Sequence, residues 1–261
     1  LHGDPNRNAY TDKTSNIAIK ADWSNGKVGM TGRSYAGTTQ FGLATTGVAG
    51  LETIVPVAGI ASWYEYTNST RSSTAYTNTL AAYCAGRYLD SDAAQAAAEE
   101  LGIVGYVHSN DYASISKAYS AYLGELANQQ TDLNGDYASQ DAAVNNDTWS
   151  IRDYTVDTTR TGPIGTTGPS KINCSALIVH GLNDYNVRTK EFELMYNAFE
   201  KAGQTAKILL HQDGHLTPTY PAGNLVFDIG DSSYDEILNR WFSHYLYNLN
   251  NGAEKMAVVT A

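Results

Sequence analysis

Three side chains of the types used in nucleophilic catalysis occur in the order serine, aspartate, histidine. Ser34 lies in the segment GRSYAG, Asp184 in the segment GLNDYNV, and His215 ends the segment QDGH. A serine hydroxyl becomes a competent nucleophile when a base takes its proton, and a carboxylate on the other ring nitrogen orients that base. We therefore interpret Ser34, Asp184 and His215 as a candidate triad. Because the base must be neutral to accept a proton, we expect activity to rise with pH as the imidazole deprotonates.

The residues around Ser34 are small where a tight turn needs them to be small. Gly32 lies two residues before the serine and Ala36 two residues after it, where the usual G-x-S-x-G pattern has a second glycine. Gly37 follows one position later. A serine on a strand-turn-helix elbow projects its hydroxyl, and the next backbone N–H, that of Tyr35, is predicted to donate to an oxyanion.

Each candidate also has a structural interpretation. The serine pattern alone is common in ordinary turns, Asp184 could cap the helix that follows it, and His215 could be a surface histidine. His211 is the main rival base, with Asp213 as its acid, although we expect His211 to pack or to form a hydrogen bond at a strand end. Structural roles are expected for two other histidines, His180 and His244.

Other chemistry is not indicated by the spacing of metal-binding or redox residues. No cluster of His, Asp or Glu has metal-ligand spacing, and no cofactor is expected. The two cysteines, Cys84 and Cys174, form no C-x-x-C motif. We interpret them as buried free thiols and leave a disulfide open.

The elements that must position the triad alternate between strand and helix patterns. Strands are predicted over 27–31, 51–60, 175–180 and 206–211, and helices over 34–46, 188–202 and 234–248. Such alternation predicts an α/β fold, with a mostly parallel sheet and helices on both faces. Ser34, Asp184 and His215 then follow strand ends in the chain order of the α/β-hydrolases.

The middle of the chain has a different character. It is rich in Ala, Tyr and Gln, with helix patterns over 91–101, 110–129 and 138–146, and is followed by a Gly/Pro/Thr loop over 156–170. We therefore predict a nucleophile-bearing part of the core over 1–73, an inserted helical lid over 74–147, and the rest of the core over 148–261.

The composition excludes some partners. The formal net charge is -10, which argues against nucleic acid or an anionic membrane as a partner. No apolar run reaches the ~20 residues of a membrane span. Charged residues make up 17% of the chain, a low share that favours an extracytoplasmic location.

Longer segments carry a family resemblance. The stretch from TGRSYAGTTQFGLATTG to GIASWYEY resembles the nucleophile region of the X-prolyl dipeptidyl aminopeptidases, serine peptidase family S15. The similarity continues through TWSIRDYT, SALIVHGLNDYNV, ILLHQDGH and NRWFSHYLY. It implies a serine peptidase that releases N-terminal X-Pro dipeptides through an acyl-enzyme on Ser34, with Asp184 and His215 completing the triad.

The resemblance also implies a substrate pocket. Trp63 and Tyr66 match aromatic residues of the proline pocket, Val187 matches its aliphatic wall, and Asn186 matches a residue that holds the N-terminal residue of the substrate. The partner implied is a peptide with proline at its second position. The resemblance further implies a cytoplasmic location, and a homodimer formed through domains that this chain lacks.

The chain departs from the family pattern in two respects. The family binds the substrate's amino group with an acidic residue in the helical segment after the pocket aromatics, but no Asp or Glu occurs between Glu65 and Asp90. The strands before the nucleophile, with their tyrosine oxyanion donor, and the C-terminal β-sandwich domain are expected elsewhere in a longer protein. An esterase or amidase of the same superfamily, or a catalytically incomplete binding or structural piece, are therefore the alternatives.

Overall fold

The computed structural model describes residues 23–68, 152–159, 165–218 and 233–260. These residues belong to two compact units, one formed by residues 1–61 and 154–261 and the other by residues 62–153. The first unit contains the sheet and the triad candidates.

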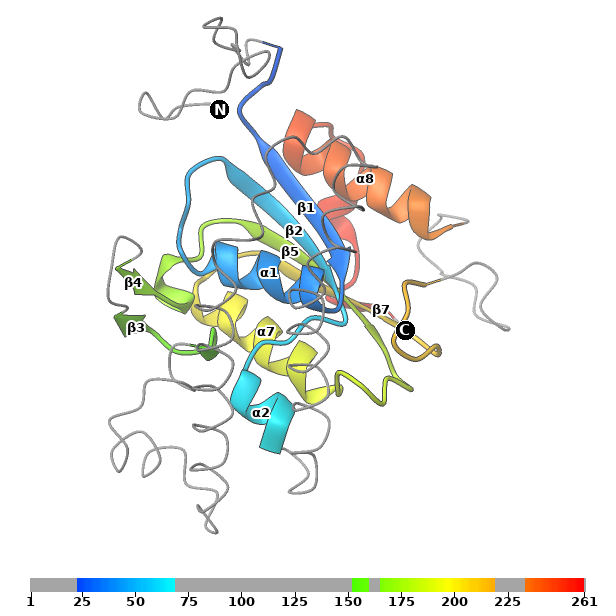
Figure 1. The fold of residues 1–261 in the computed structure, drawn as a ribbon. Helices are drawn as coiled ribbons and strands as arrows, with labels where there is room; N and C mark the ends of the chain where they lie inside the picture. The colour runs from blue at the N-terminus through cyan, green and yellow to red at the C-terminus, as the bar shows by residue number, and fades with distance from the viewer. Residues whose placement is uncertain (1–22, 69–151, 160–164, 219–232, 261) are drawn as a thin grey trace, which may run out of the picture. The chain divides into compact units, whose positions relative to one another are not determined.

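The first unit is built on a parallel sheet (Figure 1). Its strands occur in the spatial order β1 (Val28–Arg33), β2 (Leu51–Val57), β5 (Ser175–Gly181), β6 (Ala206–His211) and β7 (Val259–Thr260). Every neighbouring pair in this sheet is parallel. All residues of the central strand β5 are buried, as its run of apolar residues predicts for a strand covered on both faces. The predicted parallel α/β core is thus confirmed.

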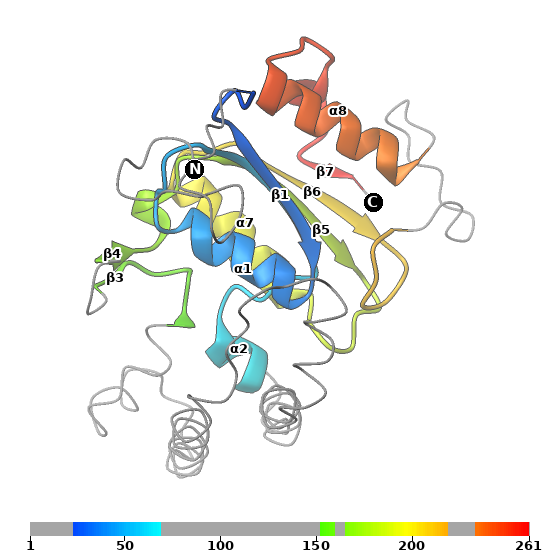
Figure 2. The same ribbon diagram turned by 45° about the horizontal axis from the view of Figure 1, so that its top comes forward.

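Helices cover both faces of the sheet (Figure 2). Helices α1 (Tyr35–Ala44) and α7 (Lys190–Lys201) lie on one face, and α8 (Tyr234–Tyr247) lies on the other. Trp241 of α8 is fully buried, and its indole N–H donates to the hydroxyl of Thr53 on β2 at 2.7 Å. This bond fixes α8 against the middle of the sheet.

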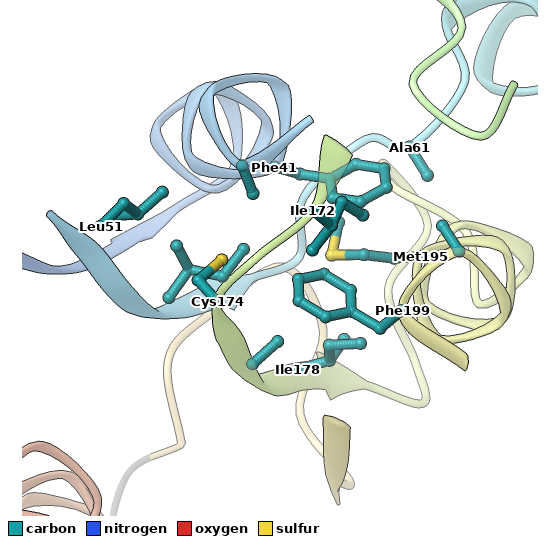
Figure 3. Packing of buried hydrophobic residues seen from close by; sticks show 12 residues of the cluster. Phe41, Leu51, Ala61, Ile172, Cys174, Ile178, Met195 and Phe199 are labelled. Carbon is teal, nitrogen blue, oxygen red and sulfur yellow. The ribbon is translucent and has the colours of Figure 1, made fainter. Parts of the chain in front are cut away.

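The main apolar cluster lies between the sheet and the helices α1 and α7 (Figure 3). Phe41 and Phe199 stack with their ring centroids 6.1 Å apart, and Met195 packs beside them. Each such side chain contributes about 1.5–3 kcal/mol when fully buried. Cys174 lies in the same cluster as a free thiol, and burial raises its pKa to about 12.

Both ends of α8 are capped. At the N-terminus, the Ser233 hydroxyl accepts the N–H of Glu236 at 3.2 Å, in the S-x-x-E pattern of a capping box. At the C-terminus, the Lys27 ammonium donates to the Tyr245 carbonyl oxygen at 3.2 Å and to Asn248 Oδ1 at 2.9 Å. The chain before β1 is therefore tied to the end of α8.

The observed elements differ from the sequence predictions at several boundaries. The strand predicted over 51–60 ends at Val57, because Ala58 has a positive φ of 48° and leaves the extended conformation. The predicted loop 156–170 contains a short antiparallel pair, β3 (Thr158–Thr159) and β4 (Thr166–Thr167), and the 3-10 turn η2 (Pro169–Lys171). A second 3-10 turn, η3 (Ala253–Lys255), and β7 follow α8 without a sequence prediction.

The second unit is described only at its two ends. Helix α2 (Trp63–Asn68) begins after Ser62, which forms an antiparallel bridge with Asp153. The predicted helices 91–101, 110–129 and 138–146, the lid boundaries 74–147 and Cys84 lie outside the described residues. Within the described ranges, no helix combines the length and apolarity that crossing a membrane requires.

Candidate active site

Ser34 occupies the turn between β1 and α1 in an unusual backbone conformation. Its φ is 61° and its ψ is -125°, a region that costs a residue with a side chain of order 1–3 kcal/mol. The surrounding backbone holds it there: the Ser34 N–H donates to the Val57 carbonyl oxygen at 2.8 Å, and the N–H groups of Gly37 and Thr38 donate to the Ser34 carbonyl oxygen at 2.8 and 2.9 Å. This is the elbow that the sequence predicts.

Small residues allow the elbow to close. A Cβ atom on Gly32 would lie 2.8 Å from the Cβ of Ala36, so both positions must be small. A Cβ on Gly37 would lie 2.9 Å from the Val57 carbonyl oxygen and 3.1 Å from Gly59 Cα. Because Gly37 has no side chain, α1 can pack closely against the segment after β2. The serine motif alone does not reveal this role.

Asp184 is held by the backbone that follows it. Its Oδ1 accepts the N–H groups of Asn186 and Val187, both at 2.9 Å, and its side chain is fully buried. Bonds from backbone N–H groups to a carboxylate are charge-assisted and fix its orientation. The other oxygen, Oδ2, is thereby presented to His215.

His215 forms a direct hydrogen bond with this carboxylate. Its Nδ1 lies 2.8 Å from Asp184 Oδ2, and its side chain is partly exposed at 17%. Because an ionised carboxylate only accepts, Nδ1 carries the proton and Nε2 is left as the acceptor. A histidine in this state is prepared to take a proton from a nucleophile.

His180 supports the same turn from inside the core. Its Nε2 donates to the Val187 carbonyl oxygen at 2.8 Å and lies 3.9 Å from Asp184 Oδ2. Burial lowers the pKa of His180, which favours the neutral ring. The structural role expected for His180 thus includes fixing the loop that carries the acid, which its position at a strand end could not reveal.

The rival pair has a poorer geometry. His211 Nδ1 lies 3.8 Å from Asp213 Oδ2, beyond hydrogen-bond distance, and both ring nitrogens of the buried His211 lack a partner within the described ranges. Burial lowers the pKa of His211. His211 therefore packs at the strand end, while His244 is bonded through Nδ1 to the Leu249 carbonyl oxygen at 2.9 Å.

The sheet topology brings the three triad candidates to one edge. Ser34 follows β1, Asp184 follows β5 and His215 follows β6, and parallel strands end at the same edge of a sheet. Within the part of the chain that the structure describes, no hydrogen bond joins the Ser34 hydroxyl to His215. The structure thus brings Asp184 and His215 into contact. It places Ser34 at the same edge of the sheet, where the carboxyl ends of the parallel strands lie.

The remaining predicted site residues lie in three places. Tyr35 is the first residue of α1, directly after the nucleophile candidate. Asn186 and Val187 form the turn that binds Asp184, and Val187 is fully buried. In the second unit, the rings of Trp63 and Tyr66 meet edge to face with centroids 5.8 Å apart.

Among the described residues, no group of three or more His, Cys, Asp or Glu could hold a metal ion.

The sheet and the elbow together define a class of protein. A nucleophile turn between a parallel strand and a helix, followed along the chain by an acid and a histidine at later strand ends, is the arrangement of the α/β-hydrolases. The fold class predicted from the sequence is therefore confirmed.

Comparison with known proteins narrows this class to one family. Residues 10–217 match the family described as X-Pro dipeptidyl-peptidase (S15 family), and the chain belongs to it. Xaa-Pro dipeptidyl-peptidase of Ligilactobacillus salivarius is 33% identical over 254 residues, and that of Lactobacillus delbrueckii subsp. lactis is 35% identical over 253 residues. These alignments cover 96% and 97% of this chain but only 26% and 27% of the two relatives.

Solved structures with a similar arrangement share little sequence. A CocE/NonD family hydrolase from Staphylococcus aureus has a TM-score of 0.46 at 16% identity, covering 91% of this chain and 32% of its own. An alpha-amino acid ester hydrolase has a TM-score of 0.44 at 15% identity, covering 90% of this chain and 37% of its own.

Proposed function

We propose that the protein is a serine peptidase that releases X-Pro dipeptides from the N-termini of peptides. Ser34 acts as the nucleophile, His215 as the general base and acid, and Asp184 as the group that orients His215. The observation that carries the proposal is the 2.8 Å hydrogen bond between Asp184 and His215 at the sheet edge where the Ser34 elbow lies. Family membership supplies the substrate class.

The first half of the reaction forms an acyl-enzyme. The Ser34 hydroxyl oxygen attacks the carbonyl carbon of the proline residue while its proton passes to His215 Nε2. The backbone N–H of Tyr35 donates to the resulting oxyanion. The C–N bond then breaks, the leaving amine takes the proton from His215, and the dipeptide remains as an ester on Ser34.

The second half releases the dipeptide. Water attacks the ester carbonyl carbon and gives one proton to His215. The bond to Ser34 breaks, its oxygen regains that proton, and the dipeptide leaves with a new carboxyl group. Asp184 stabilises the positive imidazolium in both halves.

The substrate contacts are proposed from the family resemblance. It supports Trp63 and Tyr66 as aromatic contacts for the flat, apolar proline ring, and Val187 as an aliphatic contact. Asn186 contacts the N-terminal residue of the substrate. Homodimer formation and the cellular compartment stay predictions from the sequence.

The test compares two substrate types and one variant. Ala-Pro and Gly-Pro arylamides should release their chromophore, and a fluorophosphonate probe should label the wild-type protein but not Ser34→Ala. Labelling that persists in Ser34→Ala would contradict the assigned nucleophile. Turnover of simple acyl esters without turnover of the arylamides would contradict the assigned substrate class.

One observation favours an esterase or amidase as the second candidate. The segment between Glu65 and Asp90 has no carboxylate to pair with the ammonium group of a peptide substrate. An N-acetylated X-Pro arylamide separates the two functions, because a dipeptidyl peptidase requires the free amine and an esterase or amidase does not.

A further inference from the structure

Two loops carry the acid and the base, and the backbone joins them directly. The acid loop comprises residues 181–187 and the base loop residues 211–215. The Leu182 N–H donates to the His211 carbonyl oxygen at 2.7 Å, and the Asn183 N–H donates to the Asp213 carbonyl oxygen at 3.2 Å. These bonds extend the β5–β6 pairing beyond the ends of the strands.

The Asn183 side chain adds the shortest of these connections. Its Nδ2 donates to the Gln212 carbonyl oxygen at 2.6 Å. Asn183 directly precedes Asp184, and Gln212 lies three residues before His215. One amide group therefore ties the segment next to the acid to the segment that leads to the base.

Gly181 also allows the two loops to lie close together, because it has no side chain. A Cβ atom there would overlap the carbonyl oxygens of Asp213 and Gly214. These are backbone atoms beside His215, so they could move away only by displacing the base. The φ of Gly181 is not positive, and the requirement for glycine comes from this close contact.

We propose that Asn183 and Gly181 are positioning residues that set the hydrogen bond between Asp184 and His215. The proposal rests on the function proposed above, because it assigns the two loops a shared task in catalysis. A displacement of about 1 Å at a catalytic group costs about 10²-fold in rate. The contacts of Asn183 and Gly181 keep the His215 ring at 2.8 Å from the carboxylate.

Asn183→Ala tests the proposal, with Asn173→Ala as its matched control. Both asparagines are exposed, and each donates one side-chain bond to a backbone carbonyl, in Asn173 to that of Gly47 at 3.3 Å. The readouts are the rate of fluorophosphonate labelling across pH and the downfield ¹H NMR signal of His215 Nδ1–H, assigned by its loss in His215→Gln.

The expected result separates positioning from simple stabilisation. Asn183→Ala should lower the labelling rate by about 10- to 100-fold, shift or abolish the downfield signal, and leave the melting temperature close to that of Asn173→Ala. Asn183→Gln, which keeps the amide donor, should recover part of the rate, whereas Asn183→Leu should not. Gly181→Ala should lose the downfield signal as well. If the Gly181→Ala variant does not fold, the variants at the exposed Asn183 test the proposal on their own.

Other outcomes are equally decisive. A labelling rate within twofold of wild type and an unchanged downfield signal in Asn183→Ala would overturn the proposal. Equal losses in Asn183→Ala and Asn173→Ala would also overturn it. Absence of Ser34-dependent labelling in the wild type would count against the proposed function instead, and the downfield signal would still decide the role of Asn183.

Discussion

At the scale of single residues, the backbone of Ser34 is strained, because its φ of 61° lies in a region that residues with a side chain rarely adopt. Glycine adopts a positive φ at little cost, whereas alanine meets the same steric penalty as serine. Ser34→Gly should therefore have a free energy of unfolding about 1 kcal/mol higher than Ser34→Ala, since both variants lose the hydroxyl. Urea denaturation of the two variants checks this. Equal stability would mean that the elbow is relaxed in the absence of the hydroxyl.

The carboxylate of Asp184 is expected to act through the tautomer of His215. In Asp184→Asn the amide can donate to Nδ1, so the ring proton moves to Nε2, the atom that accepts the proton of Ser34 in the proposed mechanism. By analogy with serine-protease triads, the rate of fluorophosphonate labelling should fall by about 10⁴-fold. Circular dichroism should stay unchanged, because the amide oxygen can still accept the N–H groups of Asn186 and Val187. A loss below tenfold would indicate that another group orients the base.

At the scale of elements, the strands and helices around the sheet follow from hydrophobic periodicity. The run SALIVHG predicts a buried strand, and β5 is buried along its whole length. The strand and helix pattern also places Asp184 and His215 at strand ends, which is why these two residues could be proposed as triad members from the sequence.

Features that depend on contacts between distant residues could not be predicted. The end of β2 at Val57 depends on the positive φ of Ala58, whose N–H donates to the Val179 carbonyl oxygen of β5. The support that His180 gives to the acid loop depends on the turn at Val187. The two-residue strands β3, β4 and β7 carry too little pattern for any periodicity to indicate them.

The contact between α1 and the segment after β2 should show in a pair of glycine variants. Gly37→Ala introduces a Cβ against the backbone of Val57 and Gly59, so we expect a loss of about 1–3 kcal/mol in the free energy of unfolding. Gly42→Ala, on the same helix, meets the ring of Tyr154 at 3.3 Å and gains about 0.8–1 kcal/mol of helix propensity. Thermal unfolding should rank Gly37→Ala well below Gly42→Ala. The reverse order would show that the Gly37 contact relaxes without cost.

At the scale of the whole molecule, two buried histidines link stability to pH. Burial lowers the pKa of both His180 and His211 in the folded chain, while unfolded histidine has a value of about 6.5. Below about pH 6.5 the unfolded chain therefore binds more protons than the folded chain, and the free energy of unfolding falls as the pH is lowered. Above this pH the contribution of the neutral rings is fully present.

Replacement of His211 should reduce this dependence. Both ring nitrogens of His211 lack partners among the described residues, so His211→Leu removes a proton-binding group without breaking a hydrogen bond described here. The slope of unfolding free energy against pH between about 5 and 6.5 should decrease by up to about 1.4 kcal/mol per pH unit. His244→Leu, at a position whose side chain is 25% exposed, serves as the control. An unchanged slope in His211→Leu would mean that the ring is already protonated in the folded chain.

The separation of the triad candidates along the chain has a consequence for the order of folding. Asp184 and His215 are 31 residues apart, whereas the bond between Thr53 and Ser175 that joins β2 to β5 spans 122 residues. Closing the longer loop costs about 1.2 kcal/mol more in chain entropy, at about 0.6 kcal/mol for each doubling of length. Asp184 and His215 can therefore pair before the strands β2 and β5 join. If Ser34 is the nucleophile as proposed, a refolding chain should regain its downfield imidazole signal earlier than its reactivity toward a fluorophosphonate.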